Sequence, residues 1–216
     1  NGGEFRLSSP VDKIVMDKKS VKGIESKGTF EEYEKVISTI PLPLVAKIAP
    51  DLPKDIHEKY SSKINIGCVC VIVKLNKPLT NNFWLNTNDE NMDIPGIIEY
   101  SNLNSEVGNI VYVPYYMPQT NPKFQDSDET FKEKVSKYFK TINPSLKDDD
   151  IKDIRVHRYY FSQPICQPNF MDTLPDAKIP IDGLWIADTS HYYPEDRGIS
   201  ESIGYGRKLV KRIING

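Results

Sequence analysis

A carboxylate ends a short apolar run near the C-terminus, and a glycine opens a helical pattern shortly after it. The run from Gly183 to Ala187 is followed by Asp188, and Gly198-Ile199-Ser200 begins the helical pattern. N–H groups at a helix start lack partners within the helix, and the helix dipole favours negative charge there. In open α/β sheets, ligands also bind beyond the carboxyl ends of strands. The pattern predicts a site for an anionic or electron-rich ligand, or else a carboxylate that only caps a turn.

The cysteines and histidines do not form a metal-binding pattern. Cys68 and Cys70 stand two residues apart, on one face of a predicted strand, and Cys166 lies far from them. The three histidines form no two-histidine motif and lie near no cysteine pair at zinc spacing. We therefore expect no metal site, and the cysteine usage favours a reducing compartment, which points to the cytoplasm.

Charge and hydropathy exclude two classes of partner. The 216 residues carry 28 Lys and Arg against 30 Asp and Glu, a net charge of −2, which attracts neither nucleic acid nor anionic lipid. No run approaches the roughly 18 apolar residues that span a bilayer. At 38% hydrophobic residues, the core should be modest. From the charge balance and the lack of a long apolar run, we expect a soluble protein with no membrane span and no nucleic-acid partner.

Several elements must position the predicted site. The sequence predicts a hairpin from Ile14–Met16 and Val21–Ile24, a buried strand over Val36–Ile40, and antiparallel strands through the middle of the chain. An apolar stripe from Phe131 to Ile142 predicts a helix, and Ile154–Phe161 reads as a further strand. For the last helix the predicted buried face is Ile199, Ile203, Gly206, Val210 and Ile213. These patterns predict an α+β fold, α/β overall.

The C-terminal pattern resembles a known flavin-binding motif. Gly183–Asp188 followed by Pro194–Ser202 is similar to the C-terminal motif of the FAD-dependent amine oxidase superfamily, which includes protoporphyrinogen oxidases, phytoene desaturases and UDP-galactopyranose mutases. Val11–Ile24 and Lys35–Pro41 resemble that family's adenine-side hairpin and the strand leaving its FAD domain, and Ser162-Gln163-Pro164 resembles the segment by which some members return to it. The family's glycine-rich fingerprint is missing from this sequence. The chain is therefore expected to be the C-terminal portion of a longer flavoprotein that lacks an N-terminal segment.

The resemblance implies a domain division and a set of cofactor contacts. Residues 1–45 and 166–216 would form part of an FAD-binding domain, and residues 46–165 an antiparallel-sheet substrate domain with helices. The backbone of Val11 would meet the adenine end of FAD, and Asp188 would face its ribityl and pyrophosphate region. The positions implied at the pyrimidine edge of the flavin are Gly198, Ile199 and Ser200 through their N–H groups and Arg197 as a cation.

The expected function is an FAD-dependent oxidoreductase that oxidises a C–N or C–C bond of a small-molecule substrate. Candidates to line the substrate surface are Trp84, Tyr100, Tyr115 and Tyr116, of which the two adjacent tyrosines point to opposite faces of a strand. No catalytic acid or base is assigned, since the flavin carries the redox chemistry. The chain alone should bind FAD poorly and be inactive, and a homodimer is among the expected states. The alternatives are a non-redox flavin-dependent isomerase of the sugar-mutase kind and a non-catalytic α+β binding module.

Overall fold

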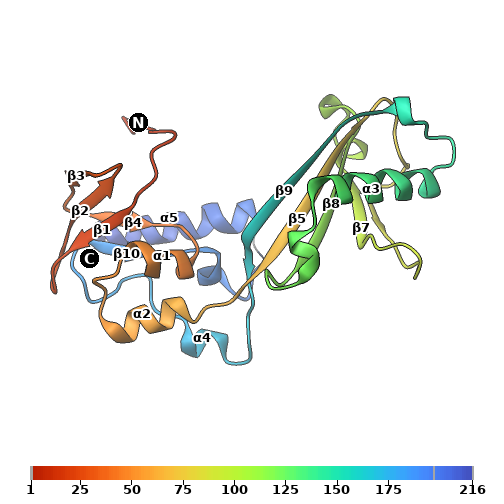
Figure 1. Ribbon diagram of the computed structural model, residues 1–216. Coiled ribbons are helices and arrows are strands. Elements are labelled where there is room, and N and C mark those ends of the chain that lie inside the picture. The colour runs from red at the N-terminus through yellow and green to blue at the C-terminus, as the bar shows by residue number, and fades with distance from the viewer. Residues whose placement is uncertain (1, 197, 216) are drawn as a thin grey trace. The chain divides into compact units, whose positions relative to one another are not determined.

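The computed structural model describes residues 2–196 and 198–215, which form two compact units (Figure 1). Unit 1 comprises Asn1–Ile64 and Gln163–Gly216, and unit 2 comprises Asn65–Ser162. Both units combine helices with sheets, as the α+β prediction requires. The predicted boundary after residue 45 falls earlier than the end of the first unit at Ile64, because the intervening helices pack into the core of unit 1.

Unit 1 begins with a small antiparallel sheet of three strands. These strands are β1 (Lys13–Met16), β2 (Val21–Ser26) and β3 (Thr29–Glu32), in the order β1-β2-β3. Ile14 pairs with Ile24, which confirms the predicted hairpin. The apolar side of the hairpin packs against α1 (Leu42–Ile48) and α2 (Lys54–Ser61). Buried residues of the C-terminal segment, from Ile179 to Ile186, belong to the same core.

A second sheet joins the two ends of the chain. β4 (Val36–Ser38) pairs in parallel with β10 (Leu184–Ile186), although almost 150 residues separate them in sequence (Figure 1). β10 is buried along its whole length, and the short helices η5 (Thr189–Tyr192) and α4 (Phe170–Thr173) belong to the same unit. The long helix α5 (Ile199–Asn215) completes unit 1.

The face that α5 buries differs from the predicted one. Leu209 is buried against Trp185 and Ala187, and Tyr205 and Ile213 pack beside it. Three of the residues predicted to be buried are instead largely exposed: Ile199, Ile203 and Val210. The prediction was wrong in its direction because the apolar residues of this helix cover more than one face, and periodicity alone does not choose between them.

Unit 2 is a five-stranded sheet with a helix packed on one face. The strand order is β6 (Trp84–Asn86), β7 (Gly96–Glu99), β8 (Ile110–Met117), β5 (Asn65–Leu75) and β9 (Ile151–Pro164), the last two residues of β9 belonging to unit 1. The helix α3 (Asp128–Ile142) buries Phe131, Val135 and Phe139 against the sheet, as predicted. Its N-cap is Ser127, whose hydroxyl accepts the N–H of Thr130 at 3.1 Å.

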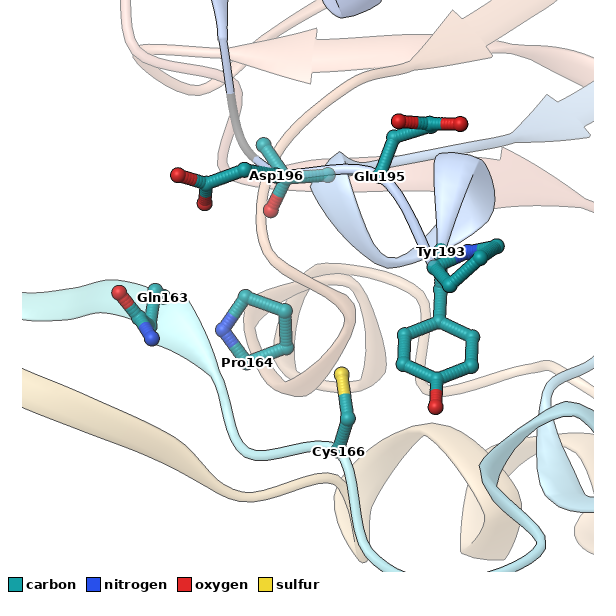
Figure 2. A pocket seen from close by; sticks show the side chains of 8 residues that line it. Gln163, Pro164, Cys166, Tyr193, Glu195 and Asp196 are labelled. Atoms are coloured by element: carbon teal, nitrogen blue, oxygen red, sulfur yellow. The ribbon is translucent and has the colours of Figure 1, made fainter.

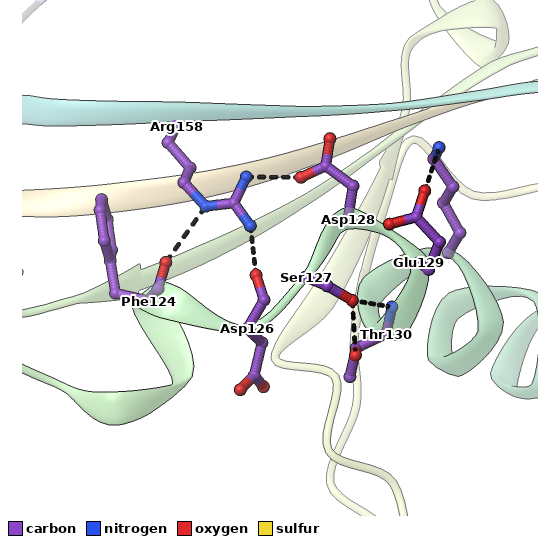
Figure 3. Close-up of polar contacts among 8 residues, drawn as sticks. Phe124, Asp126, Ser127, Asp128, Glu129, Thr130 and Arg158 are labelled. Atoms are coloured by element: carbon purple, nitrogen blue, oxygen red, sulfur yellow. Dashed lines mark hydrogen bonds and ion pairs between the residues drawn. The ribbon is translucent and has the colours of Figure 1, made fainter.

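An arginine on β9 fixes the start of α3. Arg158 donates through Nε to the carbonyl of Phe124 at 3.1 Å and through Nη1 to Asp128 at 2.6 Å, and it also bonds the carbonyl of Asp126 (Figure 3). The paired guanidinium holds the pKa of Asp128 below its usual value. This network ties the sheet edge to the loop that precedes α3.

Unit 2 is inserted into unit 1 at a single point. The N–H of Ile165 donates to the carbonyl of Ile64 at 2.8 Å, so the residues that flank the insertion lie next to each other within unit 1. Both chain ends therefore contribute to one unit while a continuous segment forms the other.

Candidate functional site

The carboxyl ends of β4 and β10 lie side by side in unit 1. Val36 pairs with Leu184 and Ser38 with Ile186, so Thr39 and Asp188 follow the two strand ends. The carboxyl ends of parallel strands are where open α/β sheets bind their ligands. The structure therefore places Asp188 at an edge suited to a ligand.

Both carboxylate oxygens of Asp188 are engaged by backbone groups. The N–H of Leu42, the first residue of α1, donates to Oδ2 at 3.0 Å, and the N–H of Ser190 in η5 donates to Oδ1 at 2.9 Å. Burial opposes ionisation, but the contact with His191 and the two N–H groups outweigh it and hold the pKa of Asp188 below its usual value. Asp188 thus carries a fixed negative charge and also caps two helical segments.

Two buried polar atoms near Asp188 have no hydrogen-bond partner in the described part of the chain. Nδ1 of His191 accepts the N–H of Asp188 at 3.1 Å, and Nε2 of the same ring is buried and unpartnered. The hydroxyl of Tyr60 is likewise buried and unpartnered, and its burial, together with the charge of Asp188, raises its pKa. Because buried polar groups are nearly always hydrogen-bonded, both atoms call for a ligand or water. Sequence reasoning missed both residues. The one signal that could have indicated His191 is its position three residues after Asp188, which suits a capping box.

Three hollows adjoin one another along this edge of unit 1. The first, of about 340 Å³, is mostly apolar and includes Val11 and Thr39. The second, of about 190 Å³, includes Thr39, Asp188 and Thr189, and the third, of about 230 Å³, includes Thr189. Neighbouring hollows share Thr39 and then Thr189, so the three hollows lie in a row, which we call the track.

The third hollow is lined by the segment that follows β9 and by the loop before α5. Figure 2 shows Pro164, Cys166 and Tyr193 around it, with the thiol of Cys166 directed toward the space between the two rings. Glu195 and Asp196 lie on its opposite wall. Burial raises the pKa of the Cys166 thiol, so this cysteine is a neutral, polarisable wall of the hollow at neutral pH.

The start of α5 is open to solvent. Ile199 and Ser200 are exposed, and a Cβ at Gly198 would lie 1.9 Å from Oε2 of Glu201, whose carboxylate therefore folds back over the helix start. An acidic side chain in the first turn is favourable there because of the helix dipole. Arg197, which was predicted to add a cation, lies outside the described residues.

The four aromatic residues predicted to line a substrate surface occupy different places in unit 2. Trp84 and Tyr116 are exposed. Trp84 pairs with Ile98, which pairs with Tyr112, so these three side chains lie on one face of the sheet. Tyr116 is four residues from Tyr112 on β8 and shares this face, which is the one opposite α3. Tyr115 is buried on the α3 side, where its ring packs against Phe131. Tyr100 lies outside the sheet in the short helix η1 (Tyr100–Asn102) and is partly exposed.

Two further features concern the described residues, namely metal-ligating clusters and membrane-spanning helices. No group of three or more His, Cys, Asp or Glu side chains among them is placed to hold a metal ion. Within the same residues, every helix is too short or too polar to cross a membrane.

Comparison with known proteins identifies a sequence family and a fold. The sequence model of the family described as "flavin containing amine oxidoreductase" matches residues 1–172. None of the curated proteins matches the chain in sequence.

Solved structures share the fold at low sequence identity. A protein assigned as a protoporphyrinogen oxidase from Exiguobacterium sp. 255-15 superposes with a TM-score of 0.72 at 14% identity, over 96% of this chain and 47% of its own. A CLA-producing fatty acid isomerase from P. acnes gives 0.64 at 12% identity, over 94% and 47% of the two chains. A reduced UDP-galactopyranose mutase gives 0.58 at 12% identity, over 78% and 38%. The chain thus spans less than half the length of each of these structures.

Proposed function

The chain belongs to the family of flavin-containing amine oxidoreductases, and we propose that it forms part of an FAD-dependent oxidoreductase. In this proposal the whole enzyme takes a hydride equivalent from a C–N or C–C bond of a small substrate. Unit 1 contributes part of the FAD-binding domain, and unit 2 contributes the substrate domain.

The track of three hollows in unit 1 carries the proposal. FAD is an elongated ligand with an apolar, aromatic adenine at one end and hydroxyl groups along its middle. The mostly apolar hollow at Val11 suits the adenine, and the carboxylate of Asp188 suits hydroxyl donors. Among the described residues, the unpartnered Nε2 of His191 and hydroxyl of Tyr60 are buried near Asp188, but neither residue lines one of the three hollows. Val11 and Asp188 fit FAD in order along one edge of the sheet.

A bound flavin would supply the redox chemistry, since its ring system accepts the hydride equivalent. The residues of this chain hold and orient the cofactor. At the start of α5, the N–H groups of Ile199 and Ser200 would stabilise negative charge at the pyrimidine edge, because they lie at the positive end of the helix dipole. The N–H of Gly198, also predicted to contact the flavin, instead donates to the carbonyl of Asp196 at 2.8 Å. For this the Glu201 carboxylate must swing away from Gly198, which a flexible exposed side chain can do at little cost.

The open face of the unit 2 sheet indicates the class of substrate. Trp84 and Tyr116 lie on this face, and on the three central strands β7, β8 and β5 its only charged side chain is Lys74. A nucleoside diphosphate would require several cations, as diphosphates are held by clustered Arg and Lys. The face therefore favours an uncharged, largely apolar substrate over a sugar nucleotide.

The similarity in fold to two isomerases keeps a non-redox isomerase as the second candidate. Anaerobic mixing of the flavin-loaded complete gene product with a substrate separates the two functions. An oxidoreductase bleaches the flavin in proportion to substrate, whereas an isomerase converts substrate with no net bleaching. A non-catalytic binding module would retain no flavin.

We place the function in the cytoplasm, since Cys70 and Cys166 are free thiols.

A bulky side chain in the track tests the cofactor site. Thr39 borders both the first and the second hollow, so Thr39→Trp should block the track and reduce the flavin content of the complete gene product at least tenfold. Thr29→Trp is the matched control, because Thr29 is exposed on β3 and borders none of the three hollows. Equal flavin-to-protein absorbance ratios in the two variants would contradict the proposed site.

A further inference from the structure

Two cysteine side chains lie next to each other on the open face of the unit 2 sheet. Val69 and Val71 on β5 are buried in the core beneath α3, so Cys68 and Cys70 point to the opposite face. The pairing of β5 with β8 keeps one regular register past both cysteines, so no bulge turns them apart. Both sulfur atoms therefore lie side by side above the same strand.

The pair lies inside the sheet and is shielded from solvent to different degrees. β5 has β8 on one side and β9 on the other. On β8, Tyr116 lies opposite Cys68 and Pro114 lies opposite Cys70. Cys68 is buried, at 5% exposure, whereas Cys70 is half-buried. An ion can therefore reach the pair from the side of Cys70 and be shielded from water at Cys68.

The spacing of the two cysteines favours a bridging ion over a disulfide. A strand rises about 3.3 Å per residue, so the Cα atoms of Cys68 and Cys70 are about 6.6 Å apart, at the upper end of the range of about 4.4–6.8 Å in disulfides. Because β8 and β9 pair with β5 on both sides, the strand resists the contraction that would bring the sulfurs into bonding distance. A metal ion in line between two sulfurs, with bonds of about 2.3 Å as in zinc thiolates, spans about 4.6 Å and needs no such contraction.

The number of available ligands selects the kind of ion. Zinc takes four ligands in structural sites, and no third His, Cys, Asp or Glu in the described part of the chain is placed to join the two thiols. Soft thiolates favour Cu(I), an ion that two sulfur ligands in a line can satisfy. The absence of a metal site expected from the sequence followed from zinc spacing, so it does not extend to a two-coordinate ion.

We propose that Cys68 and Cys70 together bind one soft monovalent ion, Cu(I), as a pair of thiolate ligands on the open face of unit 2. Each thiol releases its proton to solvent as its sulfur–copper bond forms, and the copper keeps its oxidation state, so no electron is transferred. Cys166 is exposed, belongs to unit 1 and takes no part. The site does not require a flavin, so its failure and the failure of the proposed function are separate results.

Alkylation of Cys70 tests the site in the complete gene product. Iodoacetamide labelling is followed without oxygen by peptide mass spectrometry, over a titration with Cu(I) supplied as its bicinchoninate complex. We expect Cu(I) to slow the labelling of Cys70 at least tenfold and to leave the rate at the exposed Cys166, the internal control, unchanged. In Cys68→Ala the protection of Cys70 should be lost, since the chelator withdraws Cu(I) from a single thiol. Cys68→Ser, which keeps the size of the side chain, replaces Cys68→Ala if the latter shows no cooperative urea transition.

Three results would overturn the proposal. The first is labelling of Cys70 that is equally fast with and without Cu(I). The second is protection of Cys70 that persists in the folded variant at position 68, which would show that Cys70 binds the ion without its neighbour. The third is equal protection of Cys70 by Zn²⁺, which would show a site with more than two ligands.

Discussion

Replacing Asp188 with asparagine should destabilise unit 1, because one side chain holds two backbone N–H groups from different segments. The carboxylate accepts from Leu42 at 3.0 Å and from Ser190 at 2.9 Å. Asparagine keeps a single acceptor oxygen, so its NH₂ group must face one of these N–H groups. A hydrogen bond to a charged acceptor contributes about 1.5–3 kcal/mol and a buried unsatisfied donor costs about 1–3 kcal/mol, so we expect Asp188→Asn to lower the free energy of unfolding by about 2–4 kcal/mol.

Urea denaturation followed by tryptophan fluorescence measures this loss, since Trp185 lies in the adjoining strand β10. The pKa of Asp188 is lowered in the folded state, so its contribution is present above the unfolded value of 3.8 and is lost as pH falls below it. The difference between wild type and Asp188→Asn should therefore shrink in acid. Asp149→Asn, at an exposed carboxylate, is the control and should change little. A stability for Asp188→Asn within about 0.5 kcal/mol of wild type, the range of an ordinary surface substitution, would refute the reasoning.

Three further substitutions have defined outcomes. Gly198→Val should lower the flavin content of the complete product more than Gly198→Ala does, because a branched side chain both displaces Glu201 and obstructs the helix start. Equal flavin-to-protein absorbance ratios in the two variants would remove this position from the cofactor site. Glu99→Gln should lower the thermal midpoint of unfolding, since the fully buried Glu99 carboxylate accepts from Thr80 both the N–H at 2.8 Å and the hydroxyl at 3.0 Å. An unchanged midpoint in calorimetry would contradict this. Leu209→Ala should destabilise the chain by about 2–5 kcal/mol in urea titration, as expected for a buried leucine, whereas a loss below 1 kcal/mol would mean that α5 is not packed on β10.

The elements that follow from local pattern could be predicted. The stripe at Phe131, Val135 and Phe139 fixes α3 because polar residues occupy the opposite side of the helix, leaving only one face to bury. The hairpin follows from two short apolar runs around a turn, and Ile14 pairs with Ile24 as that pattern requires.

Features that depend on long-range contacts could not be predicted. Nothing in the local sequence shows that Asp188 accepts the N–H of Leu42, 146 residues away, or that Glu99 holds the loop at Thr80. The buried, unpartnered Nε2 of His191 is also visible only in three dimensions. On α5, apolar residues extend over two faces, so the choice of Leu209 over Ile203 depends on which face meets β10.

The hydrogen bond between Ile165 and Ile64 gives the chain a modular construction. Because the two ends of the insertion are held together within unit 1, a short linker can replace residues 65–162 without separating β4 from β10. Evolution or engineering can therefore exchange the inserted sheet as a cassette while the edge that carries Asp188 is kept.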